Sequence, residues 1–218
     1  MEGYESDTEQ WEWAKAQVRE NGPAVLIAAA LAFAAIFGWR WWQSHQDQRL
    51  TAAGTKYSQM AQSLAHGDRA QALARLAELE RDYPGTAYTD QARLLAARIY
   101  VDEDQLERAA GELGAVANQS KDTELATVAR LRLARVEIAQ GKPDAALATL
   151  GSDPGKAAFA ANYHELRGDA VYAKGDKAAA LEEYRRAQAL GEVAPLLQLK
   201  IAEVSAGAAP PAAAAAAK

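Results

Sequence analysis

The hydrophobic and polar positions divide the chain into two regions with different patterns. Between Asn21 and Trp39 no residue is charged, and the stretch PAVLIAAALAFAAIFGW is apolar on every face of a helix. Nineteen helical residues rise about 28 Å, close to the roughly 30 Å hydrocarbon core of a bilayer. Farther along, apolar residues recur at helical spacing among polar ones. The pattern predicts one transmembrane helix at about residues 23–42, followed by a water-soluble helical region.

Five tryptophans and one arginine flank the apolar segment. Indole rings favour the headgroup layer, and an arginine can extend its charged head into the same layer. A buried core helix is a weaker interpretation, because few core helices are apolar on every face over this length. A cleaved signal peptide is also disfavoured, because acidic residues outnumber basic ones before the span. The predicted membrane-interface residues are Trp11, Trp13, Trp39, Arg40, Trp41 and Trp42.

Charge next to the span does not decide its orientation. Lys15 and Arg19 lie on one side, and Arg40, Arg49 and Lys56 lie on the other. The positive-inside rule therefore gives no clear answer, and a long domain can cross the membrane whatever its charge. Both orientations of the helical region stay open on these residues alone.

Behind the span the composition changes to Ala, Leu, Glu, Arg and Gln, which are good helix formers. Proline and glycine fall between the periodic segments, and no segment has a convincing strand pattern. The predicted fold class is all-α. The expected helices lie at about 47–65, 68–82, 87–101, 104–117, 122–140, 143–150, 156–174, 176–190 and 193–205.

An internal repeat becomes visible when the short turns are aligned. Gly67, Asp104, Gly141 and Gly175 lie 37, 37 and 34 residues apart. Five residues after each turn there is an alanine, which lets two helices approach closely, and four residues further there is a large side chain. Such a period resembles the tetratricopeptide repeat, and an irregular helical bundle is less probable because four aligned turns rarely arise by chance. The alanines are Ala72, Ala109, Ala146 and Ala180, and the large residues are Leu76, Leu113, Leu150 and Tyr184.

These patterns predict four parts of the chain. An acidic tail (1–22) precedes the transmembrane helix (23–42), and a tetratricopeptide-like solenoid follows (43–205). The helix at 193–205 is expected to cap the repeats, because the last unit must cover its apolar face. The segment 206–218 is rich in alanine and proline, which predicts a disordered tail.

Candidate chemistry is sparse. The net charge of −5 argues against nucleic acid as the main partner, and the chain has no cysteine. His45, His66 and His164 lie in separate segments without metal-ligand spacing, and no GxSxG, Walker or GxGxxG motif occurs. We therefore predict no catalytic, metal-binding or cofactor-binding residue. An enzyme would need a convergent polar pocket in the folded domain, for example around His164.

Repeat stacks of this kind expose a concave surface formed mainly by the first helix of each pair. The turn alignment maps a candidate groove for a peptide or partner protein onto this surface. Alternatively, its leucines belong to the core and its charged residues are ordinary surface; neither interpretation is preferred. The candidate groove consists of Leu94, Arg98, Leu131, Arg135, Glu165, Asp169 and Tyr172.

Several segments resemble the YfgM family, the ancillary subunits of the bacterial Sec translocon. The most specific is FGWRWWQSHQ at 37–46, which follows the span, and the acidic tail ending in ENG also fits. The segments YVDEDQLERAAGEL at 100–113, LRLARVEIAQGKPDAALATL at 131–150 and ELRGDAVYAKGDKAAA at 165–180 extend the resemblance through the repeats. The alanine- and proline-rich tail departs from the family pattern.

The resemblance implies more than the residue patterns do. Members of the family are anchored in the inner membrane, with the N-terminus in the cytoplasm and the repeat domain in the periplasm. They associate with the SecYEG channel and with PpiD, a membrane-anchored periplasmic chaperone, and assist newly translocated proteins, so unfolded clients are candidate ligands. The resemblance implies no catalytic residue and no cofactor. A membrane-anchored regulatory adaptor with cytoplasmic repeats stays open as an alternative, because the charges flanking the span are ambiguous.

Overall fold

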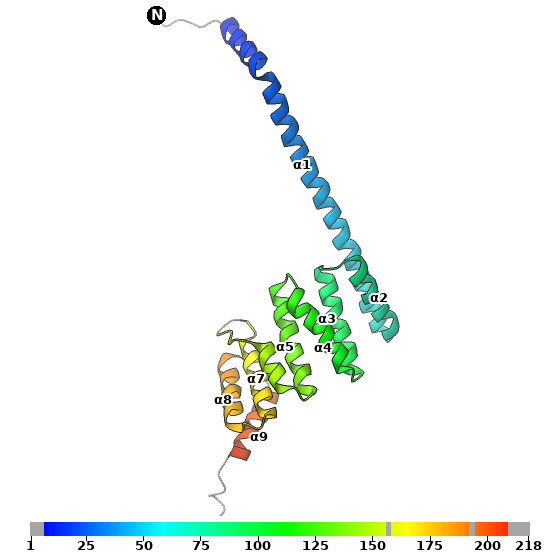
Figure 1. Ribbon diagram of the computed structural model, residues 1–218, viewed down its shortest axis with the longest axis vertical. Helices are drawn as coiled ribbons and strands as arrows, with labels where there is room; N and C mark the ends of the chain where they lie inside the picture. The colour runs from blue at the N-terminus through cyan, green and yellow to red at the C-terminus, as the bar shows by residue number, and fades with distance from the viewer. Residues whose placement is uncertain (1–6, 156–157, 192–194, 209–218) are drawn as a thin grey trace, which may run out of the picture. The chain divides into compact units, whose positions relative to one another are not determined.

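The computed structural model describes residues 7–155, 158–191 and 195–208, without the side chains of 7–14, 16–25, 28, 29, 207 and 208. The chain divides into two units, residues 1–52 and 53–218. Every regular element of the described ranges is an α-helix (Figure 1), which confirms the all-α fold class. The helices are α1 (Asp7–Ala65), α2 (Arg69–Asp82), α3 (Ala87–Asp102), α4 (Leu106–Gln119), α5 (Thr123–Ala139), α6 (Pro143–Leu150), α7 (Ala160–Ala173), α8 (Lys177–Leu190) and α9 (Pro195–Ala208).

The first helix, α1, continues without a break through the predicted span and into the repeat unit. Trp39 and Trp42 lie with their ring centroids 5.4 Å apart, and both are exposed. Arg40 and Trp41 are exposed as well, whereas the side chains of Trp11 and Trp13 lie outside the described residues.

Within the described part of the chain, no helix combines the length and the apolar character that crossing a bilayer requires. The predicted span at 23–42 is therefore not confirmed. Part of that prediction, residues 23–25, 28 and 29, concerns side chains outside the described set.

The four predicted turns have the same backbone conformation. Gly67, Asp104, Gly141 and Gly175 have positive φ angles of 80°, 57°, 71° and 90°. At each turn the N–H of this residue donates to the carbonyl three residues earlier, and the next N–H donates to the carbonyl five residues earlier. This is the Schellman arrangement that ends a helix. Asp104 adopts the conformation usually left to glycine, and α4 therefore begins at Leu106 instead of the expected 104.

The alanines and large residues of the repeat have the predicted roles. All four alanines are fully buried, and the large residue that follows each one is at most 8 % exposed. In the last pair, a Cβ added to Gly168 of α7 would lie 2.5 Å from Cε1 of Tyr184. The equivalent positions of the two middle pairs have Ala97 and Ala134, where the partner is a smaller leucine. Glycine thus faces tyrosine in the last pair, and alanine shares a core cluster with leucine in the two middle pairs.

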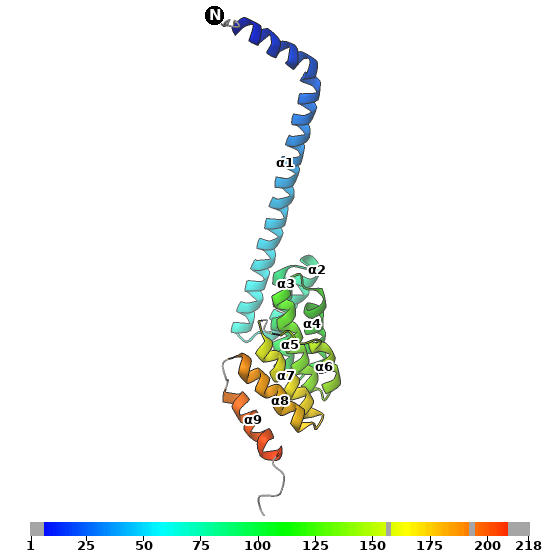
Figure 2. The same ribbon diagram turned by 90° about the vertical axis from the view of Figure 1, so that its left-hand side faces the viewer.

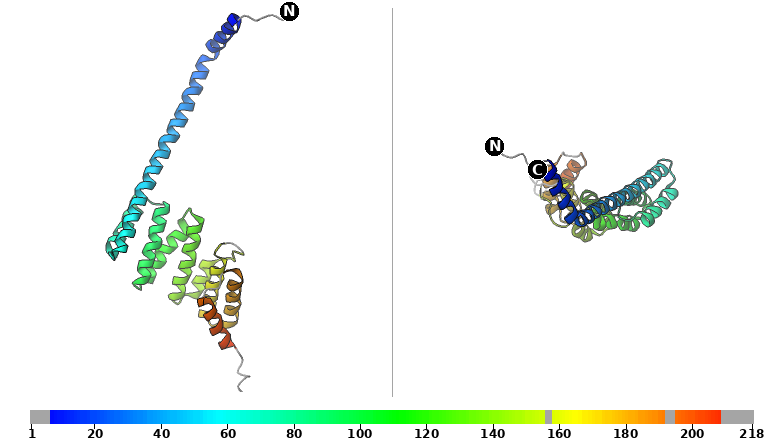
Figure 3. Two further views of the ribbon diagram at one scale, coloured as in Figure 1. Left: turned by 180° about the vertical axis from the view of Figure 1, so that it is seen from behind. Right: turned by 90° about the horizontal axis from the view of Figure 1, so that it is seen from above.

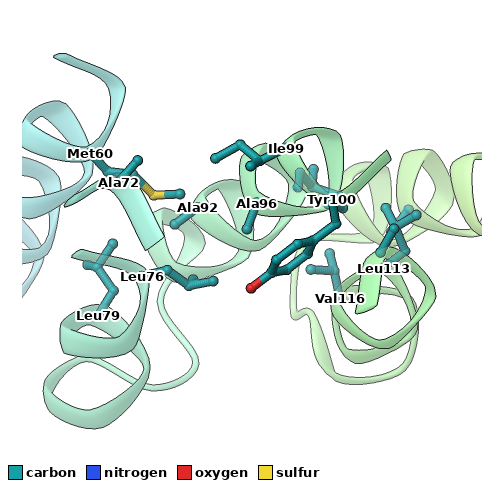
Figure 4. Close-up of a cluster of buried hydrophobic side chains, with 14 of the residues drawn as sticks. Met60, Ala72, Leu76, Leu79, Ala92, Ala96, Ile99, Tyr100, Leu113 and Val116 are labelled. Atoms are coloured by element: carbon teal, nitrogen blue, oxygen red, sulfur yellow. The ribbon is translucent and has the colours of Figure 1, made fainter. Parts of the chain in front are cut away.

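Successive helical hairpins lie side by side along the repeat unit (Figures 2 and 3). The core follows the stack as three clusters. The largest joins the end of α1, from Ala53 onward, to α2, α3, α4 and part of α5 (Figure 4). A second cluster joins α5, α6 and α7, and a third joins α7 and α8 to α9.

Three helix boundaries near the C-terminal end differ from the expected positions. The helix expected at 156 begins at Ala160, because Phe159 adopts a left-handed φ of 67° that a helix cannot contain. The final helix begins at Pro195, where a missing backbone N–H has little cost. It runs to Ala208, three residues into the segment predicted as a tail, and 209–218 lie outside the described residues.

Candidate partner-binding site

A pocket of about 350 Å³ opens between α3, α4 and α5. It brings together three of the predicted groove residues, Leu94, Arg98 and Arg135. Its volume lies near the lower end of the range of about 300–1,000 Å³ that is usual for ligand pockets. The residues that line it are Leu94, Ala97, Arg98, Val101, Leu106, Leu113, Arg132, Arg135, Val136 and Ala139.

The pocket has an apolar floor and a basic rim. Leu94, Leu113 and Val136 are buried in the main core, so the floor is fixed by packing. Val101, which also lines the pocket, is 42 % exposed, so the pocket is open to solvent at this residue.

Three arginines form the rim: Arg98 from α3, and Arg132 and Arg135 from α5. All three are exposed, and none of their side chains forms an ion pair or a hydrogen bond with another described residue. The chain as a whole carries a net charge of −5. Unpaired positive charge concentrated around an apolar pocket is therefore a local feature and does not follow from the overall composition.

The other predicted groove residues are divided between two places. Leu131 is half-buried and packs against the second core cluster, with Ala134 and Leu166. Glu165, Asp169 and Tyr172 are partly exposed, and all three contact α9. Lys200 donates from Nζ to Oε1 of Glu165 at 2.7 Å and to Oδ2 of Asp169 at 2.8 Å. The hydroxyl of Tyr172 donates to Oε1 of Glu203 at 2.9 Å.

Electrostatics reinforce the contact between α7 and α9. Burial lowers the pKa of Lys200, but its hydrogen bonds with Asp169 and Glu165 outweigh that effect and raise the pKa above the ordinary value. Burial, followed by the neighbouring Asp169 carboxylate, raises the pKa of Tyr184, whose hydroxyl donates to Oδ1 of Asp169 at 2.8 Å. Lys200 therefore stays charged near neutral pH, and the two carboxylates each have a donor.

Sequence reasoning missed Arg132 and Lys200. Arg132 lies three residues before Arg135, so the spacing RLAR placed both on neighbouring turns of one helix face. The turn alignment does not include this position, because Arg132 is not at an offset that the repeats share. Lys200 could not be found in this way, because α9 has no following turn from which to align it.

A second, more polar pocket of about 200 Å³ surrounds His164. Nδ1 of His164 lies 2.7 Å from Oε2 of Glu183, and Nε2 lies 3.5 Å from Oδ1 of Asp153. Arg167 and Arg186 both donate to Oε1 of Glu183. This is the convergent polar arrangement that an enzyme would require.

The geometry of this pocket favours a structural role. His164 is only 3 % exposed and Glu183 only 8 % exposed, and both are engaged by neighbouring charged side chains. Both imidazole nitrogens already face carboxylates, and the charge of Glu183 is compensated by two arginines. Buried charges are tolerated when they are paired in this way. We interpret the cluster as an ion-pair network that joins α7 and α8.

The stacked hairpins, their shared turn and the concave pocket define a class of protein. A family model described as a tetratricopeptide repeat-like domain matches residues 15–206. A solved structure, MamA from residue 41 to its end from Desulfovibrio magneticus RS-1, has a TM-score of 0.57 and 16 % identity. That match covers 71 % of this chain and 84 % of the other. The two share the tetratricopeptide-like fold.

Three relatives carry the name ancillary SecYEG translocon subunit. The Escherichia coli (strain K12) protein is 34 % identical over 94 % of this chain and 100 % of its own length. The Haemophilus influenzae relative is 32 % identical, over 79 % of this chain and 84 % of its own. The Aggregatibacter actinomycetemcomitans relative is 34 % identical, over 80 % and 84 %. The chain belongs to this family of ancillary SecYEG translocon subunits, as the sequence resemblance predicted.

Proposed function

We propose that this protein is a non-enzymatic interaction scaffold, anchored in the bacterial inner membrane and associated with the Sec translocon. The observation that carries the proposal is the near full-length similarity to relatives named for that association. A tetratricopeptide-like stack suits the role, because such stacks act by presenting an extended concave surface to other proteins.

The anchor in this proposal is the apolar part of α1. Large apolar side chains there are exposed in the monomer, including Leu31, Phe33 and Phe37, which are 67 %, 62 % and 65 % exposed. A contiguous exposed apolar surface indicates contact with a membrane or another protein. Tryptophans at 39, 41 and 42 suit the headgroup layer. In this proposal residues 1–22 are cytoplasmic and the repeat unit is periplasmic.

The proposed partners are the SecYEG channel, a PpiD-like membrane-anchored chaperone and polypeptides that leave the channel. The channel is suggested by the names of the relatives, and the chaperone and clients by the sequence resemblance. A scaffold with one surface in the membrane and another on the repeats has two independent places for such contacts.

Site-specific photo-crosslinking in native membranes tests this function. A photoreactive amino acid at Ala32, in the apolar segment, should capture a subunit of the Sec channel. The same group at Ala139, in the mouth of the pocket, should capture a chaperone or an emerging polypeptide. Residue Arg185, exposed on α8 and away from the pocket, provides the control position. Failure to capture the channel from any position would refute the proposal.

A topology reporter separates the proposal from its alternative. Alkaline phosphatase fused after residue 205 is active only outside the cytoplasm, so we expect an active fusion. An inactive phosphatase together with a fluorescent green-fluorescent-protein fusion at the same site would place the repeats in the cytoplasm. That outcome would favour a regulatory adaptor.

A further inference from the structure

One position of the repeat has opposite charges in different units. Six residues before the last three of the four turns the chain has Arg98 in α3, Arg135 in α5 and Asp169 in α7. These positions are equivalent because the turns that follow them share a positive φ angle and the same backbone hydrogen bonds. The same face of the stack is therefore basic at the pocket and acidic at the C-terminal end.

At the acidic end the next helix, α9, packs on α8 as α5 packs on α4 beside the pocket. The helix α9 buries Leu197 and Val204 against α8, and the partly buried Ile201 packs with them. From the same side of α9, Lys200 reaches Glu165 and Asp169. At the acidic end, the helix that follows the pair is thus amphipathic and presents a cation between apolar side chains.

The basic pocket offers the complementary arrangement and has no occupant from within the described residues. We propose that it binds an amphipathic polypeptide segment that carries carboxylates beside apolar side chains. This inference rests on the proposed scaffold function and specifies the chemistry of the partner at one surface. The carboxylates would pair with Arg98 and Arg135, and the apolar side chains would enter between Leu94, Val101 and Val136.

The residue types favour this occupant over a basic or wholly apolar one. A guanidinium can bind a carboxylate with two parallel hydrogen bonds, which adds both energy and orientation. An apolar partner alone would leave three arginines partly desolvated without a counter-charge, which is unfavourable. A helix that lays an apolar face into a groove is also an established mode of peptide recognition.

The helix α9 supplies matched probes for a binding experiment. The acidic probe is a fluorescent peptide of residues 195–208 with Lys200→Glu, and the control probe is the same peptide unchanged. Binding is measured by fluorescence anisotropy with the full-length protein in detergent micelles or nanodiscs. We expect the acidic peptide to bind at least tenfold more tightly than the control peptide. Equal binding of the two peptides, or no binding of either, would overturn the inference.

Substitutions in the protein then locate the binding. Arg135→Glu should weaken binding of the acidic peptide at least tenfold and strengthen binding of the unchanged peptide. Arg185→Glu makes the same change of charge at an exposed position of α8 and should alter neither affinity by more than about twofold. Circular dichroism melting of each variant shows that it is folded. If both substitutions weaken the acidic peptide equally, the attraction is general electrostatics and the pocket is not the site.

The peptide test and the crosslinking test can fail separately. Capture of the channel from the apolar segment, combined with no peptide selectivity, would leave the scaffold function intact and remove this inference. Peptide selectivity without capture of the channel would show an acidic-peptide site on a protein with another function.

Discussion

Two equivalent parts of the repeat unit differ in how their charged residues are paired. Between α3, α4 and α5 there is an open pocket with unpaired arginines, whereas the equivalent charged residues of α7 are paired with Lys200 of α9. In the middle of the stack the first helix of a pair places an alanine in the same core cluster as a leucine of the second helix. At the C-terminal end it packs with glycine against tyrosine. One repeat pattern can thus leave a pocket open or close the end of the stack.

The glycine–tyrosine contact at the closed end should be the most sensitive to change. Gly168→Ala adds a Cβ that would lie 2.5 Å from the Tyr184 ring. Because overpacking a tight helix contact forces shifts in both helices, we expect a loss of about 1–3 kcal/mol in the free energy of unfolding. Urea denaturation followed by circular dichroism measures this loss.

The control for this prediction is Gly111→Ala in α4, where an added Cβ meets no atom within 4 Å. That change should stabilise the protein by up to about 1 kcal/mol, through helix propensity alone. Combining Gly168→Ala with Tyr184→Leu recreates the alanine–leucine contact of the middle pairs. The double variant should lose less stability than the sum of the two single variants. Simple additivity would show that the two residues are not coupled.

Removing the cation that closes the C-terminal end should have an intermediate effect. Lys200→Met keeps the length of the side chain but leaves Glu165 and Asp169 without their shared donor. Hydrogen bonds to charged groups contribute about 1.5–3 kcal/mol, and this site is partly open to water, so we expect about 1–2 kcal/mol. Hydrogen exchange should show the loss as faster exchange in α9. Unchanged protection of α9 would mean that apolar burial alone holds the helix in place.

The same lysine predicts a pH dependence at alkaline pH. Because its pKa is raised in the folded protein, the stability that it contributes is fully present below the ordinary lysine pKa of 10.5. That stability is lost as the pH rises through the folded value. The wild-type protein should therefore lose more stability above pH 10.5 than Lys200→Met does. Parallel urea titrations of the two proteins, at pH 8 and at pH 11, provide the measurement.

The smallest effect is expected at Glu112 of α4, a half-buried carboxylate. Oε2 of Glu112 has no hydrogen-bond partner in the described structure, and Nη1 of Arg93 lies 3.9 Å away. Burial, and then the charge of Glu80, raise the pKa of Glu112. A raised carboxyl pKa means that the folded state binds the proton more tightly, so stability increases as the pH falls through that value.

Glu112→Gln should remove this pH dependence and raise stability at pH 7 by less than about 1 kcal/mol. Chemical denaturation at pH 5 and pH 7 tests both statements. Glu165→Gln is the contrasting variant, because that carboxylate is paired with Lys200 and its loss should destabilise the protein. Destabilisation by Glu112→Gln at pH 7 would show that the contact with Arg93 matters more than burial.

Much of the fold was predictable because its determinants are local. The turn positions, the alanines after them and the large residues four positions later all have the predicted roles in the structure. The turn forms even where Asp104 takes the place of glycine, because aspartate tolerates the left-handed conformation better than most residues. The candidate groove was predicted only in part. Leu94, Arg98 and Arg135 line one pocket, whereas Leu131 packs into the core and Glu165, Asp169 and Tyr172 contact α9.

By itself, the sequence determined the helices, the turns and the repeat, because these depend on neighbours within a few residues in the chain. It also determined the family, through segments spread along almost its full length. Only the tertiary structure decided where a pocket stays open. That outcome depends on whether a later segment, here α9 with Lys200, reaches the face with a complementary charge. Such a contact joins residues about thirty positions apart, so no local pattern could predict it.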